Sequence, residues 1–160
     1  MPRILKCRMS TIVLIAVTLL SFQVSAARPS INDMQTCQGL IDFVSLKLEG
    51  LPLTYNKADV EIAQKGLDAY NKYIQSTFIS PGLLTFSQGD KNKAEALQEQ
   101  VNIYKVKVVK SYENQYPYNK LSKGFIKSLN ECTQKAVPNG HDLNMLKNAF
   151  IKMVDMIKNQ

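Results

Sequence analysis

Apolar residues recur at spacings of three and four along five stretches of the chain, which is the pattern of an amphipathic helix. The first stretch shows it clearly, with Met34, Cys37, Ile41, Val44 and Leu48 on one face. The five stretches cover residues 31–49, 57–79, 91–116, 119–137 and 143–157. Each is long enough for a helix of a globular protein, so the pattern predicts five helices.

Residues typical of helix ends flank these stretches. Ser30 followed by Asp33 resembles a capping box, in which each side chain satisfies the other residue's backbone. The residues predicted to cap helices at the N-terminus are Ser30, Asn56, Asp90 and Asp142. The predicted stops are Gly50 with Pro52, the run Ser80, Pro81 and Gly82, and Pro117.

Two positions refine this reading. Residues 101–109 alternate apolar and polar residues as a strand does, but the length of the stretch and the lack of a partner strand favour a helix. Gly66 lies inside the second stretch, where glycine costs about 1 kcal/mol relative to alanine. A residue without a side chain at that position indicates a close helix crossing.

These elements predict an all-α protein, a five-helix antiparallel bundle that forms one domain over residues 27–160. The composition, 45% hydrophobic and 21% charged, is that of a globular chain. No resemblance to a known family supplies a function.

The first 26 residues are predicted to be a signal peptide. Arg3, Lys6 and Arg8 precede an apolar stretch of 12 residues, 11–22, which is short for a membrane span. Val24, Ser25 and Ala26 then form a small-x-small cleavage site. We expect a periplasmic or secreted protein without a transmembrane span; the alternative is an uncleaved anchor.

Removal of residues 1–26 takes Cys7 away and leaves Cys37 and Cys132. In an oxidising compartment an even pair is most simply a disulfide, and two buried free thiols are the alternative. Both cysteines lie on apolar stripes, so the bond should join the first helix to the fourth. Closing so long a loop stabilises a fold by about 4.7 kcal/mol in the chain-entropy model.

The residues needed for common catalytic and cofactor sites are lacking. His141 is the only histidine and lies in a predicted turn, and the seven glycines are too widely spaced for a phosphate-binding loop. Glu95 and Glu99 lie one turn apart, but neighbouring lysines favour a solvated charged face. We therefore expect no enzyme activity, no metal site and no cofactor.

The basic residues provide one candidate site. The formal net charge of +7 falls to +4 without the leader. The excess of basic residues lies within residues 104–127, where tyrosines are interspersed among the lysines. Such a region either binds an anionic surface or polymer or is simply a solvated face. The mature chain keeps only Arg28 and has no tryptophan, so no nucleic-acid partner is expected. The candidate residues are Lys105, Lys107, Lys110, Tyr116, Tyr118, Lys120 and Lys123.

A second candidate lies between the second and third helices, in a connection over residues 80–89. Leu83, Leu84 and Phe86 occur in this segment, where polar residues are usual. They either tuck under the connection or form a contact with a partner.

The leading hypothesis is an exported, non-enzymatic protein that binds another protein, as an inhibitor, immunity protein or chaperone does. One alternative is a carrier of an apolar small molecule in the bundle core, and another is anionic-surface binding through residues 104–127. A core cavity lined by Met and Phe side chains would favour the carrier.

The mature chain should begin at Ala27, because cleavage follows the small-x-small site. Intact-mass measurement of the exported protein should give the mass of residues 27–160. A mass that includes residues 1–26 would contradict the signal peptide.

Overall fold

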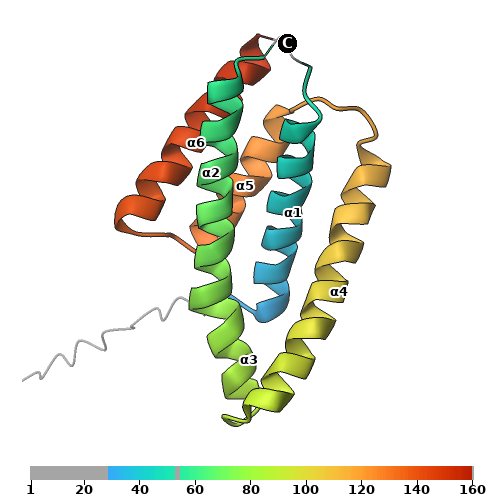
Figure 1. The fold of residues 1–160 in the computed structure, drawn as a ribbon, viewed down its shortest axis with the longest axis vertical. Helices are drawn as coiled ribbons and strands as arrows, with labels where there is room; N and C mark the ends of the chain where they lie inside the picture. Colours follow the sequence, from blue (N-terminus) through green and yellow to red (C-terminus); the bar gives the residue numbers. More distant parts are fainter. Residues whose placement is uncertain (1–28, 53–54, 160) are drawn as a thin grey trace, which may run out of the picture.

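The computed structural model describes residues 29–52 and 55–159, and its regular structure there is entirely helical (Figure 1). The predicted signal peptide lies outside these residues. The helices are α1 (Ile31–Glu49), α2 (Lys57–Ile74), the π-helical segment η1 (Gln75–Ile79), α3 (Ser80–Phe86), α4 (Lys91–Gln115), α5 (Lys123–Lys135) and α6 (Gly140–Lys158). The predicted all-α class is confirmed, and so is the helix at residues 101–109.

Helix ends follow the predicted caps with one exception. The Ser30 hydroxyl accepts from the Asp33 backbone N–H in a capping box, and the side chains of Asn56 and Asp90 cap α2 and α4. The prediction that Asp142 caps the last helix is wrong. Asn139 occupies that position, and Asp142 lies in the first turn of α6, where its charge favours the helix dipole.

The predicted stop at Ser80, Pro81 and Gly82 is also wrong, because α2, η1 and α3 form one continuous helical rod that ends at Phe86. Ile79 and Ser80 keep helical backbone angles through the junction. A proline inside an α-helix removes a hydrogen bond and clashes with the preceding turn. Here the wider π turn comes directly before Pro81, and Pro81 stands at the start of α3, where a missing N–H is tolerated. Counted as rods, the described part of the chain therefore has the five predicted helices.

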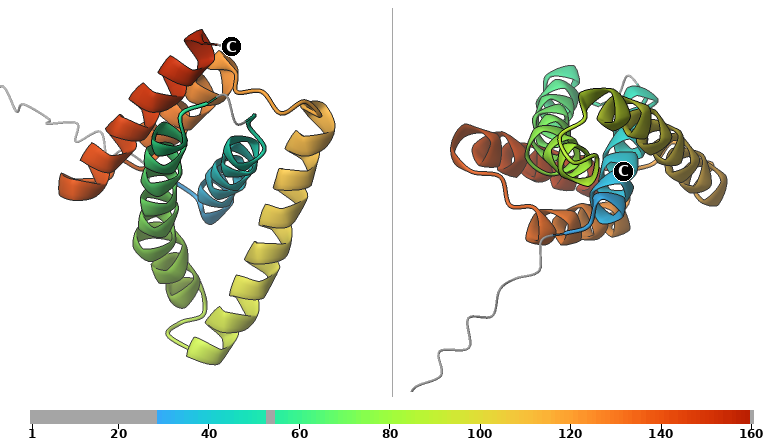
Figure 2. Two further views of the ribbon diagram at one scale, coloured as in Figure 1. Left: turned by 45° about the horizontal axis from the view of Figure 1, so that its top comes forward. Right: turned by 90° about the horizontal axis from the view of Figure 1, so that it is seen from below.

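Helix α1 lies at the centre of the fold, with α2, α4 and α5 around it and α6 packed on α2 and α5 (Figures 1 and 2). Eleven of its 19 residues are buried, whereas α4 buries only Val101. Phe43, which is fully buried, stacks on Tyr112 of α4 at 5.3 Å between ring centroids and meets Phe125 of α5 edge-on at 5.2 Å.

Neighbouring helices in this bundle are not all antiparallel. Residues of α1 pair with later and later residues of α4: Thr36 with Tyr104, Phe43 with Tyr112, and Lys47 with the carbonyl of Tyr116. Helices α1 and α4 therefore run parallel, which corrects the predicted arrangement. The long α2–α3 rod makes this possible, because it carries the chain back along α1 before α4 begins (Figure 1).

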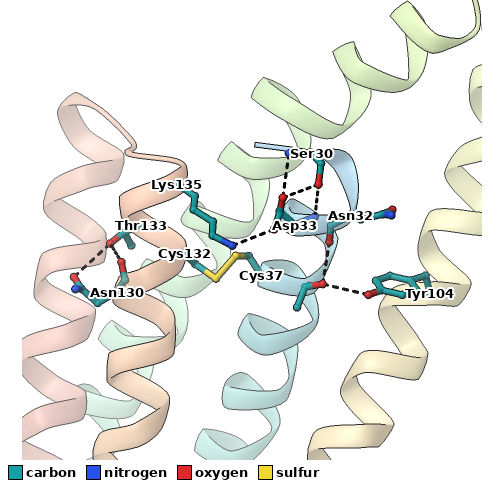
Figure 3. Close-up of a disulfide and its surroundings, with 10 residues drawn as sticks. Ser30, Asn32, Asp33, Cys37, Tyr104, Asn130, Cys132, Thr133 and Lys135 are labelled. Carbon is teal, nitrogen blue, oxygen red and sulfur yellow. Dashed lines mark hydrogen bonds and ion pairs between the residues drawn. A yellow bond between two sulfur atoms is a disulfide. The ribbon is translucent and has the colours of Figure 1, made fainter. Parts of the chain in front are cut away.

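The predicted disulfide is present and joins α1 to α5. Cys37 and Cys132 are bonded with their Cα atoms 5.7 Å apart, so the two helices are neighbours as expected (Figure 3). The Lys135 ammonium contacts the Asp33 carboxylate at 3.1 Å beside the bond. A hydrogen bond from the Ser30 hydroxyl and the Lys135 charge lower the pKa of Asp33. This end of α1 is thus fixed by a covalent bond, a cap and an ion pair.

The close helix crossing indicated by Gly66 occurs between α2 and α6. A Cβ atom at Gly66 would lie 2.5 Å from the carbonyl oxygen of Met145 and 2.6 Å from Cβ of Ala149. One of these atoms belongs to the backbone and the other to a short side chain, so neither can move aside easily. Glycine at this position lets the two helices approach.

Gly66→Ala should lower the free energy of unfolding by about 2 kcal/mol, because overpacking costs 1–3 kcal/mol. Helix propensity alone predicts the opposite sign, a gain of about 1 kcal/mol. Gly124→Ala on α5 is the matched control, since its nearest neighbour would be Ser122 Oγ at 3.4 Å. Urea unfolding followed by circular dichroism measures both, and equal effects of the two variants would contradict the close crossing.

Candidate binding groove

A shallow groove lies between α1 and α4, and we call it the α1–α4 groove. It has a volume of about 330 Å³. Its lining residues are Asp42, Ser45, Leu46 and Glu49 of α1 with Lys105, Val106 and Val109 of α4. In Figure 1, α1 lies between α2 and α4, which converge toward the α3 end of the molecule and stand apart at the other end.

Three large apolar side chains stand exposed along this groove and its outer edge. Leu46 is 43% exposed, Val106 is 62% exposed, and Ile103, one helical turn before Val106, is 49% exposed. We call them the apolar stripe. Because apolar area in water is unfavourable by roughly 25 cal/mol per Å², a partner that covered these exposed side chains would gain free energy.

A network of polar side chains joins the two helices that line the groove, α1 and α4, to α2. Asp42 accepts from the Asn71 amide at 2.7 Å and pairs with the Lys105 ammonium at 2.8 Å. The Gln38 amide donates to the Asn71 carbonyl and to Gln75 Oε1, each at 3.3 Å. These bonds connect α1, α2 and α4.

Gln75 is the residue where the network meets the π-helical segment. As the first residue of η1, it donates to Gln98 Oε1 of α4 at 2.7 Å and to Ser80 Oγ at 2.9 Å. A π turn shifts the register of the residues around it, which here brings one side chain into contact with both α1 and α4. These paired polar groups, of which Gln38 is buried and most of the others are half-buried, favour one register of α2 and α4 on α1.

Lys47 holds the far end of α4. Its side chain is buried at 6% exposure, donates to the carbonyl of Tyr116 at 2.7 Å and lies 5.1 Å from the centre of the Phe43 ring. A charged hydrogen bond and a cation–π contact together stabilise the position of this ammonium. The sequence pattern does not predict that Lys47 is buried, because lysine side chains rarely are.

The structure separates the three residues of the predicted partner contact at 80–89. They lie on α3 rather than in a connection. Leu83 is buried, Leu84 is 39% exposed and Phe86 is 76% exposed at the end of the rod. Leu83 thus belongs to the core, and only the other two face solvent.

Two of the residues of the predicted anionic-surface site make contacts within the fold, and the others are exposed. Lys105 is paired with Asp42 inside the α1–α4 groove, and Tyr116 packs on Phe43 and Phe125. Tyr118 is 79% exposed in the segment between α4 and α5. The remaining candidates are exposed on α4, on that segment and at the start of α5: Lys107, Lys110, Lys120 and Lys123.

Neither a metal-binding cluster nor a spanning helix emerges from residues 29–52 and 55–159. No three His, Cys, Asp or Glu side chains gather there in a way that could hold a metal ion. None of the helices there is both long and apolar enough to cross a bilayer.

Comparison with known proteins gives no relative: no family model, no curated protein and no solved structure matches the chain.

Proposed function

We propose that this protein is an exported, non-enzymatic binding protein that holds an amphipathic helix of a partner protein in the α1–α4 groove. The observation that carries the proposal is the apolar stripe, Leu46, Ile103 and Val106, exposed beside a groove floored by the central helix. Helix-in-groove recognition uses apolar side chains spaced by three or four residues on the partner, and this stripe offers them a complementary surface.

The rigidity of the groove supports the proposal. The polar network fixes α2 and α4 relative to α1, and the disulfide fixes α1 relative to α5. A preformed groove loses little conformational entropy when it binds, so more of the apolar contact appears as affinity.

The charges of the groove specify the partner's chemistry. Asp42 is neutralised by Lys105, whereas Glu49 has no ion pair with any residue that the structure describes. Glu49 is also the last residue of α1, where the negative end of the helix dipole adds to its charge. A partner helix with an apolar face and a Lys or Arg at one end fits this pattern.

The position of the cavities favours a partner over a small molecule carried in the core. Five grooves in the described part of the chain, 210–470 Å³ in volume, open onto the surface. None of them is lined by Met34, Phe43 or Met153, the bulky side chains at the centre of the core. Export is supported by the predicted leader and by the disulfide, which persists in oxidising compartments.

Site-specific photo-crosslinking tests the groove directly. A photoreactive phenylalanine analogue at Val106 should cross-link a protein from the envelope or culture fluid of the producing cells, and the linked peptide should be an amphipathic helix. The same analogue at Ile151 of α6, which is 57% exposed, is the matched control and should give no such product.

The synthetic peptide identified in this way should bind the purified protein with 1:1 stoichiometry by calorimetry. Val106→Asp should weaken binding at least 10-fold, about 1.4 kcal/mol, while Ile151→Asp leaves it unchanged. Both positions are exposed, so the thermal midpoints should stay close to the parent value. Equal cross-linking at the two positions, or a peptide whose binding is insensitive to Val106→Asp, would overturn the proposal.

A further inference from the structure

A second groove lies on the opposite side of α5 from the disulfide partner α1, between α5 and α6, and we call it the α5–α6 groove. It has a volume of about 430 Å³, within the range of small-molecule sites. Ile126, Val154 and Ile157 form its floor, and Lys123, Lys127 and Lys158 stand around it. None of its lining residues is acidic.

The floor keeps apolar surface area that the packing of the helices leaves exposed to solvent. Leu146, Ala149, Met153 and Met156 of α6 are fully or almost fully buried. Val154 and Ile157 are only half-buried, as is Ile126 across the groove. An apolar chain lying on these three side chains would remove their remaining area from water.

The three lysines make the rim positive. Lys127 contacts Glu131 at 4.0 Å and Lys158 contacts Asp155 at 3.4 Å, both between neighbouring turns of one helix and both largely exposed. Such surface pairs contribute about 0.5 kcal/mol or less, so the ammonium groups can turn to a bound anion at little cost. Lys123 forms no ion pair with any described residue.

We propose that the α5–α6 groove binds a single-chain anionic amphiphile, a free fatty carboxylate, with its alkyl chain on Ile126, Val154 and Ile157 and its carboxylate among the lysines. The apolar floor selects the chain and the cationic rim selects the sign of the head group. A cationic amphiphile fits less well, because none of the lining residues is acidic and three are lysines. This site is independent of the α1–α4 groove.

Titration calorimetry with dodecanoate below its micelle concentration tests this site on the oxidised protein, residues 27–160. Dodecanoate should bind 1:1, at least 10-fold more tightly than dodecyltrimethylammonium, which has the same chain and the opposite charge. Its affinity should fall as salt is raised, because salt screens the exposed lysines.

Two variants locate the site, each with a matched control. Val154→Glu should weaken dodecanoate binding at least 10-fold, whereas Ile151→Glu, one turn earlier on the same helix and 57% exposed, should not change it. The Lys127 side chain is 81% exposed, and Lys127→Gln should weaken binding 3- to 10-fold, with Lys110→Gln as its control.

Several results would overturn the proposal. One is that monomeric dodecanoate shows no saturable binding, and another is that the cationic amphiphile binds equally well. The others are equal effects of the groove variants and their controls, and binding only to anionic phospholipid vesicles. An acidic peptide that displaces dodecanoate from the groove and binds there more tightly would also contradict it. None of these outcomes bears on cross-linking at Val106, so the two sites are tested separately.

Discussion

The burial of helix α1 is the constraint on which the rest of the structure depends. Met34, Ile41, Phe43, Val44 and Leu48 are at most 1% exposed, and each large apolar side chain buried in this way stabilises a fold by roughly 1.5–3 kcal/mol. One helix can reach such burial only if others cover it on several sides, and α2, α4 and α5 do so. The candidate groove is one part of α1 that these helices leave open, and Asp42, Ser45, Leu46 and Glu49 line it together with residues of α4.

Polar contacts then decide how the surrounding helices sit on α1. Apolar packing tolerates small shifts of one helix along another. The bond from Gln38 to Gln75, and the contacts that the Asp42 carboxylate accepts from Asn71 and Lys105, are satisfied in one register. The bond between Cys37 and Cys132 fixes the remaining neighbour, α5. A groove framed in this way can present Leu46, Ile103 and Val106 at constant spacing, which recognition of a partner helix needs.

Local patterns in the sequence predicted much of this fold and little of the candidate site. The helical phases, three of the four N-caps and the close crossing at Gly66 each follow from a few neighbouring residues, and the disulfide follows from the two cysteines that remain after the leader. The stop at Ser80, Pro81 and Gly82 failed because η1 accommodates Pro81, and a π turn has no simple sequence signature. The parallel pairing of α1 and α4 depends on which helices become neighbours in the fold. The spacing of apolar residues within each helix does not predict this. The sequence does hint at the apolar stripe. Ile103 and Val106 are apolar residues that lie off the core-facing side of the helix, which is formed by Val101, Tyr104 and Val108. Only the fold shows that no described element covers them.

Native-state hydrogen exchange tests the central position of α1 most directly. The amides of Leu40, Ile41 and Val44 should exchange only through global unfolding, with an opening free energy equal to the free energy of unfolding measured in urea. The exposed end of the rod around Phe86 should open at lower cost, because few buried contacts hold it. If the α1 amides instead exchange through a local opening well below the global value, while those of α2 and α6 do not, then α1 is a peripheral element and this account of the fold is contradicted.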